Sequence, residues 1–164
     1  MRILGIDPGT AICGYGCVEW IQGRLRPIAY GAIRTGPELP LEKRLLLIHE
    51  RLQKLLTELQ PERIGVEQLF FNRNVTTAMA VGQARGVILL AAAQANLPLE
   101  EYTPGQIKQA VTGYGKADKG QVTGMTVRLL GLKETPKPDD VADALAIAIC
   151  TAHGCEQRNV WPRR

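Results

Sequence analysis

The chain has 164 residues, a formal net charge of +4, and a composition of 45% hydrophobic and 22% charged residues. The length predicts one domain, and the composition is that of a folded globule, which excludes a disordered polymer and a collagen-like repeat. The small positive charge permits a nucleic-acid partner without requiring one.

Neither a signal peptide nor a membrane span is predicted. The opening MRILGID reaches a charge too early for a signal peptide, and the longest apolar run, 87–95, has about half of the ~20 residues that a span needs. The four cysteines form no C-x-x-C pair, so we expect buried thiols rather than a metal site. We therefore expect a cytoplasmic protein with no membrane partner.

The first two thirds of the chain predict three strands in succession and then an alternation of helix and strand. Short apolar runs bounded by turn residues predict strands, and leucines at helical spacing up to Pro61 predict the first helix. In chain order we expect strands over 2–7, 13–20 and 25–35, a helix over 41–59, a strand over 63–68, a helix over 75–95 and a strand over 98–102. The first three strands form an antiparallel meander in this prediction.

The last third of the chain is predicted to be helical. Thr103, Pro104 and Gln106 are the residue types of a capping box that starts a helix, and Gly113 ends it. Two further helices are expected over 118–130 and 140–152. This order of elements favours an α/β fold in which helices flank one mixed sheet.

Two predicted strands end in the same type of triplet, Gly5-Ile6-Asp7 and Gly65-Val66-Glu67. Alternation along a strand places each carboxylate on the face of the glycine two residues earlier. Open α/β sheets bind ligands at the carboxyl ends of their strands. If the two strands are parallel neighbours, Asp7 and Glu67 converge; otherwise each acid would only cap the following turn.

The last predicted helix contains an isolated acid. From Val141 to Cys150 the only polar residue is Asp143, and an ionised carboxylate in a buried helix is costly unless it meets a cation. Asp140 lies within one turn of it. Asp139 and Asp140 could also cap the helix, and the spacing leaves open whether Asp139 belongs to a site.

Asp7, Glu67, Asp140 and Asp143 would together place four negative charges in one cleft. Two Mg²⁺ ions would supply the matching positive charge, and Mg²⁺ prefers oxygen ligands. Two metal ions about 3.5–4 Å apart are a device for phosphodiester hydrolysis. Both histidines are expected on the solvent-exposed surface, so no Ser-His-Asp arrangement competes with this interpretation.

Four segments agree in order and spacing with one known family over nearly the whole chain. They read ILGIDPGT at 3–10, VEQLF at 66–70, GQARG at 82–86 and DDVADALAIA at 139–148. In these motifs the chain resembles the RuvC family of bacterial Holliday junction resolvases. The resemblance implies a ribonuclease-H-like fold with a five-stranded sheet, three antiparallel strands followed by parallel ones. We expect one nuclease domain over 1–155 and a short tail over 156–164.

The resemblance also implies an activity and partners. A homodimer would cut four-way (Holliday) DNA junctions by paired symmetrical nicks in recombination and repair, leaving 5′-phosphate and 3′-hydroxyl ends, and would work with the branch-migration complex RuvA–RuvB. The four carboxylates would be the catalytic, metal-binding acids, with two Mg²⁺ per active site and Mn²⁺ as a substitute. The preferred cleavage sequence cannot be obtained from the chain.

The only two phenylalanines, Phe70 and Phe71, follow the strand that ends at Glu67. They could close the core, but a loop aromatic beside an active carboxylate can also stack on an unpaired base. The resemblance assigns this stacking to Phe70, with Arg73 near a phosphate. The residues alone leave open which phenylalanine stacks.

The stretch 102–133 carries five Lys or Arg residues against one acid. Scattered lysines usually form a solvated helical face. The resemblance instead places Lys108 and Lys119 at the active site, where an ammonium could stabilise the charge developing on the phosphate. Lys116 would contact DNA phosphates.

Ala78, Gly82 and Gly86 are spaced by four on one stripe of the helix over 75–95. A glycine inside a helix costs about 1 kcal/mol relative to alanine, so a packing reason is expected. The helix either packs closely on its own sheet or meets its copy in a twofold dimer, which suits a junction with twofold symmetry.

Three other functions remain open at this point. An ATP-binding domain of the actin and sugar-kinase superfamily also starts with a strand ending in G-x-D-x-G, but it needs a second lobe for which 164 residues are too few. A related nuclease acting on RNA or an RNA/DNA hybrid would use the same acids. A non-catalytic junction-binding scaffold would have no need to keep all four.

Overall fold

A five-stranded mixed sheet forms the centre of the computed structural model, which describes residues 1–69 and 75–160, with side chains for 1–69 and 78–155. The strands are β1 (Arg2–Asp7), β2 (Ile12–Ile21), β3 (Arg24–Arg34), β4 (Arg63–Glu67) and β5 (Leu99–Tyr102), in the order β3-β2-β1-β4-β5. The first three pair antiparallel, and β4 pairs parallel with β1 and β5. The predicted fold class is confirmed.

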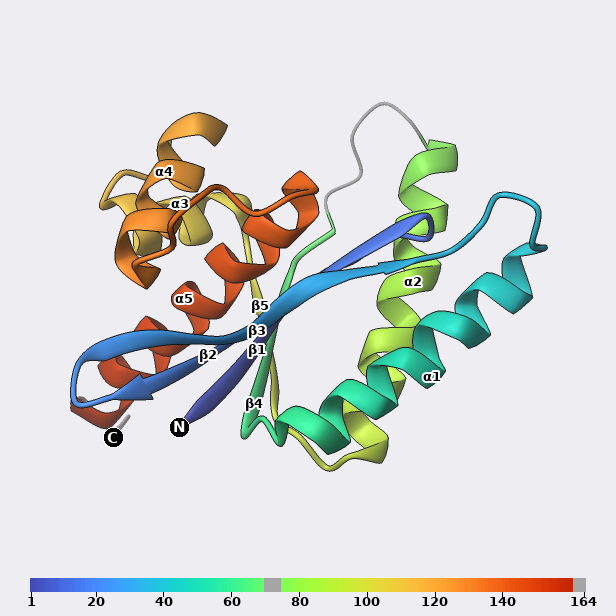
Figure 1. Ribbon diagram of the computed structural model, residues 1–164, viewed down its shortest axis with the longest axis horizontal. Helices are drawn as coiled ribbons and strands as arrows, with labels where there is room; N and C mark the ends of the chain where they lie inside the picture. Colours follow the sequence, from blue (N-terminus) through green and yellow to red (C-terminus); the bar gives the residue numbers. More distant parts are fainter. Residues whose placement is uncertain (70–74, 161–164) are drawn as a thin grey trace.

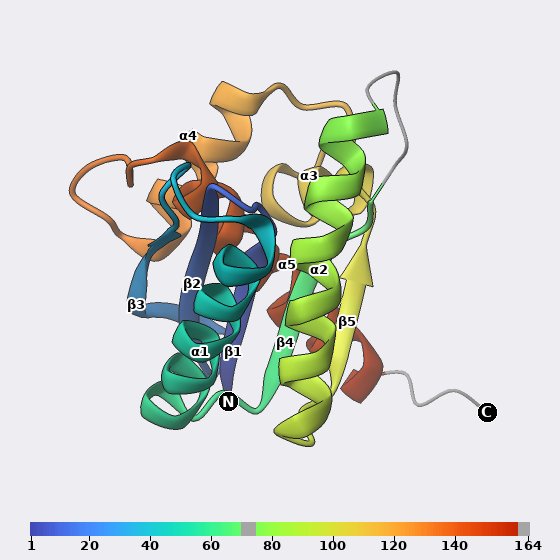
Figure 2. The ribbon, with the colours of Figure 1, turned by 90° about the vertical axis from the view of Figure 1, so that its right-hand side faces the viewer.

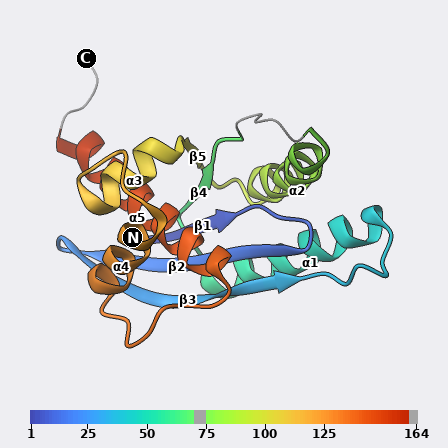
Figure 3. The ribbon, with the colours of Figure 1, turned by 90° about the horizontal axis from the view of Figure 1, so that it is seen from above.

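Helices cover both faces of the sheet. They are α1 (Leu41–Leu59), α2 (Val75–Gln94), α3 (Pro104–Thr112), α4 (Lys119–Leu130) and α5 (Asp139–Val160). α1 and α2 lie on one side of the strands, and α3, α4 and α5 lie on the other (Figure 1). Figure 2 looks onto α1 and α2 with the sheet behind them, and Figure 3 shows the same layers from above. Over the residues described, no helix is both long and apolar enough to cross a membrane.

The helix boundaries follow local capping chemistry. The predicted capping box of α3 is present, with the Thr103 side chain accepting from the Gln106 backbone N–H at 3.1 Å. A second box starts α4, where Asp118 plays the same part. α5 was predicted to end at residue 152, but no proline follows until Pro162, and the helix continues to Val160.

Each face of the sheet has its own apolar core. The alternation along β1 sends Leu4 and Ile6 towards α1 and α2, where Ile48 and Leu52 of α1 meet them. Ile3 points to the other face and joins a cluster that is dominated by α5, with further side chains from α3 and α4. The central strands β1 and β4 are therefore buried on both sides, as their nearly continuous apolar residues indicate, whereas β3 at the edge is partly exposed.

Glycines bring α5 unusually close to the strands beneath it. A Cβ atom on Gly5 would lie 2.1 Å from the carbonyl oxygen of Ala144, and one on Gly14 would lie 2.1 Å from the carbonyl oxygen of Asp140. Real Cβ atoms do not approach backbone atoms so closely, so only glycine fits at either position. The backbone of α5 therefore rests directly on β1 and β2, which fixes where its acids fall.

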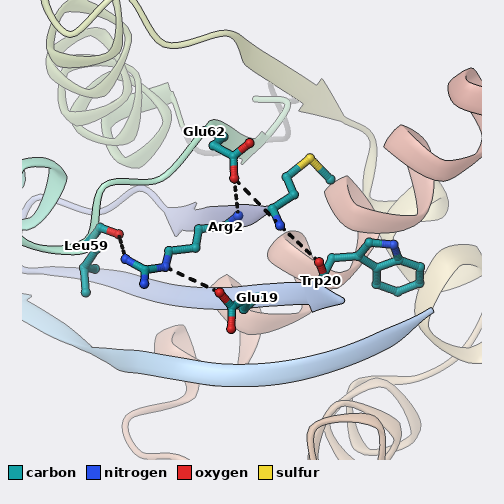
Figure 4. A network of polar contacts seen from close by, with 6 residues as sticks. Arg2, Glu19, Trp20, Leu59 and Glu62 are labelled. Carbon is teal, nitrogen blue, oxygen red and sulfur yellow. Dashed lines mark hydrogen bonds and ion pairs between the residues drawn. The ribbon is translucent and has the colours of Figure 1, made fainter. Parts of the chain in front are cut away.

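Polar contacts fasten the chain at the start of β1, the end of the strand away from Asp7. The N-terminal amine donates to the Trp20 carbonyl at 3.1 Å and lies 3.8 Å from a Glu62 oxygen. The backbone N–H of Arg2 donates to the same carboxylate at 2.9 Å, and its guanidinium donates to the Leu59 carbonyl at 3.1 Å (Figure 4). This network joins β1 to β2 and to the segment between α1 and β4.

The four cysteines are buried and free, as predicted. The expectation for the histidines was wrong, because both are partly buried between elements. His49 bonds Gln94 across α1 and α2 at 2.8 Å. His153 lies 3.0 Å from the Ala110 carbonyl, and its ring meets Trp20 edge-on. Neither contact involves a serine or an aspartate.

Candidate active site

Asp7 and Glu67 end neighbouring parallel strands. The register pairs Gly5 with Gly65, so each acid lies two residues beyond a paired glycine and on the face that α5 covers. The charge of Glu67 acts on the carboxyl group of Asp7. The predicted convergence of the two strand ends is confirmed.

α5 adds two acids to this end of the sheet. Its first turn is seated on β2 by the contact between Gly14 and the Asp140 backbone. Gly14 pairs with Asp7 across β1 and β2, so the start of α5 lies beside Asp7. The charges of Asp140 and Asp143 both act on the Asp7 carboxyl group. The four acids predicted from three separate segments therefore lie near one another.

A cavity of about 210 Å³ opens at this place. Three of the acids line it, joined by Lys108 of α3 and Lys119, the first residue of α4. Asp140 is not among the lining residues, although its charge reaches Asp7. Apolar walls come from Pro104, Ile107, Val122, Ala146 and Ile147. These walls could not be predicted from the sequence, because apolar helix positions follow the same pattern whether they face a core or a cavity.

The pKa values of the three carboxyl groups that line the cavity are raised. Burial, followed by the charges of Asp143, Asp140 and Glu67, raises the pKa of Asp7 to about 8. Burial is also the main cause that raises the pKa of Glu67, with the charge of Asp143 next and Lys108 opposing. The pKa of Asp143 is raised by burial, against the lowering effect of Lys119. Full ionisation of the cluster near neutral pH therefore needs added positive charge.

Lys119 supplies part of that charge and is held by two acids of α5. Its Nζ atom lies 3.2 Å from Asp143 and 3.3 Å from Asp139. The other oxygen of Asp139 is 3.2 Å from Lys137 Nζ, and hydrogen bonds from Lys137 and Lys119 lower the pKa of Asp139. Among the described residues no backbone N–H donates to the Asp139 side chain, so this acid is not a helix cap here.

The chemistry of the donor set fits a hard divalent cation. Buried carboxylates that repel one another are the ligands that Mg²⁺ prefers, and the raised pKa of Asp7 reports their need for a positive partner. As the side chains of residues 1–69 and 78–155 lie, however, no three His, Cys, Asp or Glu residues surround one point closely enough to hold a metal ion. One Asp143 oxygen is instead paired with Lys119.

Of the three other predicted site residues, the structure describes only Lys116. Phe70 and Arg73, with Phe71, lie outside the residues that the structure describes. Lys116 is exposed in the connection between α3 and α4 and does not line the cavity. Lys108 and Lys119 line the cavity together with Asp7, Glu67 and Asp143.

The glycines of α2 do not pack closely on the protein's own sheet. Among the described residues, a Cβ atom on Gly86 would meet nothing within 4 Å, and one on Gly82 would meet only Leu69, at 3.4 Å. Met79 and Leu90 on the same helix are 59% and 53% exposed. Of the two explanations for the small-residue stripe, close packing within the chain is wrong.

The strand order and the carboxylates at the ends of β1 and β4 and on the covering helix define a ribonuclease-H-like nuclease. A family model described as "Crossover junction endodeoxyribonuclease RuvC" matches residues 3–151. The chain belongs to this RuvC family of endonucleases.

Relatives of the same description match nearly the full length. The protein of Desulfitobacterium hafniense is 58% identical over 97% of this chain and 96% of its own, and that of Heliobacterium modesticaldum is 60% identical over 93% and 94%. The solved structure "T. thermophilus RuvC in complex with Holliday junction substrate" is 39% identical, with a TM-score of 0.91 over 96% of both chains. The yeast mitochondrial resolvase Ydc2, 15% identical with a TM-score of 0.68 over 97% of this chain and 82% of its own, shares the fold.

Proposed function

We propose that this endonuclease resolves four-way (Holliday) DNA junctions by paired symmetrical nicks, in recombination and DNA repair. The observation that carries the proposal is the meeting of Asp7, Glu67, Asp140 and Asp143 at one end of the sheet, in a chain of the RuvC family. A phosphodiester is an anion, so a cluster of acids can receive it only with cations present.

We infer that the family's divalent-metal requirement is met here by two Mg²⁺ ions per site, with Mn²⁺ as a substitute. Asp7, Glu67, Asp140 and Asp143 would hold them, since their oxygens are the hard donors gathered at this end of the sheet. When bound, such ions activate a water and stabilise the leaving oxygen, which leaves 5′-phosphate and 3′-hydroxyl ends. The acids of β1 and β4 sit on rigid strands, and α5 is pressed onto those strands, so the donors are fixed in place.

The two lysines of the cavity would serve the phosphate. The Lys119 ammonium lies beside Asp143, and Lys108 faces Glu67. Each can stabilise negative charge that develops on the scissile phosphate. The apolar side chains Ile107 and Val122 line the same cavity and limit access of bulk water, which strengthens these interactions.

Outside the cavity we propose three contacts with DNA. Phe70 would stack on an unpaired base at the junction centre, with Arg73 near a phosphate, and both remain predictions from the sequence. Lys116, which is exposed between α3 and α4, would contact a phosphate without reading bases.

We further propose a homodimer that uses α2. Gly86 leaves open space on this helix, and Met79 and Leu90 are exposed beside it, so a second copy could approach closely and bury apolar area. Two sites related by a twofold axis suit a substrate of the same symmetry. Co-operation with RuvA–RuvB, a cytoplasmic location and the division into a domain over 1–155 and a tail over 156–164 also stay predictions.

The test is cleavage of a synthetic immobile four-way junction with Mg²⁺, using the full chain, Asp7→Asn and the control Glu134→Gln, which removes an exposed charge outside the cavity. We expect paired nicks across the branch from the full chain and the control. Asp7→Asn should lose about 1000-fold or more in rate, because a metal ligand is removed. Equal cutting of plain duplex or of an RNA/DNA hybrid would contradict the proposal.

A further inference from the structure

Asp139 is the one acid at the start of α5 that the four-carboxylate site does not use. It is the first residue of the helix, its side chain is 55% exposed, and it does not line the cavity. Asp143 is one helical turn further on, so the two carboxylates lie on the same side of α5. Lys119 reaches both.

The two ends of Lys119 are held differently. Its backbone is fixed by the capping box of α4, in which Asp118 bonds the Gln121 N–H at 2.9 Å. Its side chain has four rotatable carbons and is 59% exposed, so a single ion pair would leave it several conformations. Asp143 holds the ammonium from the cavity side, and Asp139 holds it from outside.

Asp139 is itself held in place. One oxygen accepts from Lys119 and the other lies 3.2 Å from Lys137 Nζ. The resulting chain of contacts runs Lys137–Asp139–Lys119–Asp143, from the connection before α5 into the cavity. A carboxylate with a lysine on each oxygen has fewer free orientations than one with a single partner.

We propose that Asp139 is a positioning residue for Lys119, keeping its ammonium at the mouth of the cavity while Asp143 is engaged elsewhere. Asp143 serves two partners in the proposed function, since it pairs with Lys119 and belongs to the acids assigned to the metal ions. Asp139 does not line the cavity, so no contact there competes with its ion pair to Lys119. The inference rests on the proposed junction cleavage, in which Lys119 acts on the scissile phosphate.

The experiment compares Asp139→Asn with the matched control Glu134→Gln. The control removes one exposed negative charge from the connection between α4 and α5, at a residue that does not pair with Lys119. Junction affinity is measured without metal, in EDTA, and cleavage under saturating enzyme with Mg²⁺. Asp139→Asn should bind the junction as the control does but cleave about three- to tenfold more slowly. Asp139→Glu, which keeps a carboxylate, should recover most of the rate.

A double-mutant cycle separates positioning from a general charge effect. In a Lys119→Ala background, Asp139→Asn should cause no further loss, because the residue through which it acts is gone. An equal further loss there, or a wild-type rate for Asp139→Asn alone, would overturn the inference. Both results leave junction cleavage by the unaltered chain intact, whereas failure of that cleavage would count against the proposed function itself.

Discussion

The two faces of the central sheet differ at the ends of β1 and β4. Towards α1 and α2, β1 and β4 present large side chains that are fully buried, among them Leu4 and Ile64. Towards α5, the same two strands present Gly5 and Gly65 and end in acids. Both faces bury apolar side chains, but under α5 the two strands give up part of this area at their glycines so that the helix can lie directly on them.

The difference shows where stability and chemistry reside in this fold. Acids on a strand and on a helix can act together only if the helix lies close, and side chains beneath α5 would push it away. The glycine-lined face therefore brings Asp140 and Asp143 to Asp7, at the cost of burying charge. The cluster beneath α1 and α2 is apolar and buries no comparable group of acids.

The largest expected effect comes from adding one carbon to the face beneath α5. Gly5→Ala places a Cβ 2.1 Å from the Ala144 carbonyl, so α5 must move, and we expect a loss of about 3 kcal/mol or more in the free energy of unfolding. Urea denaturation measures it. Cleavage per folded molecule should also fall, since the acids of α5 are displaced.

Leu52→Ala is the matching change on the other face. It removes a buried side chain of α1 and should cost about 2–5 kcal/mol through the cavity that it leaves. Cleavage per folded molecule should stay near that of the unaltered chain. If Gly5→Ala keeps full cleavage, the contrast between the faces is broken.

The next effect is a dependence of stability on pH that arises from the carboxyl groups on the α5 face. Because the pKa of Asp7 in the folded chain is about 8, against an ordinary value of 3.8, the folded chain binds an extra proton between these pH values. Without metal, stability should therefore be fully present below about pH 4 and be lost as pH rises through about 8, by on the order of 2 kcal/mol or more. Urea denaturation in EDTA at several pH values measures this loss.

Asp7→Asn is the control for the pH dependence. An amide cannot ionise, so the variant should lose much of the slope and be more stable than the unaltered chain at pH 8 in EDTA. Leu52→Ala should lower the whole curve without changing its slope. An unchanged slope in Asp7→Asn would show that Asp7 does not cause the dependence.

A smaller effect separates chemistry from binding on the α5 face. Lys119→Ala removes an ammonium from the cavity and should slow cleavage about 10- to 100-fold while leaving junction affinity nearly unchanged. Lys116→Ala, at an exposed position outside the cavity, should lower junction affinity and the salt dependence of binding while leaving the cleavage rate of bound junction nearly unchanged. Equal effects of both changes on affinity would argue against a catalytic role for Lys119.

The smallest effect tests the outer surface of α2. The methyl group of Gly86→Ala would meet none of the described side chains within 4 Å, so the monomer should gain about 1 kcal/mol from helix propensity. In the proposed dimer the added methyl groups should weaken association, which sedimentation at several concentrations measures. Gly124→Ala, in equally open space on α4, should give the gain without the loss. A monomer at micromolar concentration in the unaltered chain would contradict the dimer.

Local chemistry made much of the fold predictable. The strands of the meander and the first helix lie within one or two residues of their expected bounds. Alternation, leucine spacing and turn residues are local features, so they can be recognised in the sequence directly. The capping box at Thr103 was readable for the same reason. The positions of His49 and His153 were not, since partial burial depends on which element packs against each ring.

The amino-acid sequence was sufficient to predict that strands end in Asp7 and Glu67, that glycines precede both acids, and that one apolar helix contains Asp143. These are properties of residue type and spacing. The folded structure was needed to show that the strands are parallel neighbours and that α5 rests on their glycines. It alone also gave Lys119 two carboxylate partners. Contacts between segments far apart in the chain depend on how whole layers pack, so no local pattern predicts them.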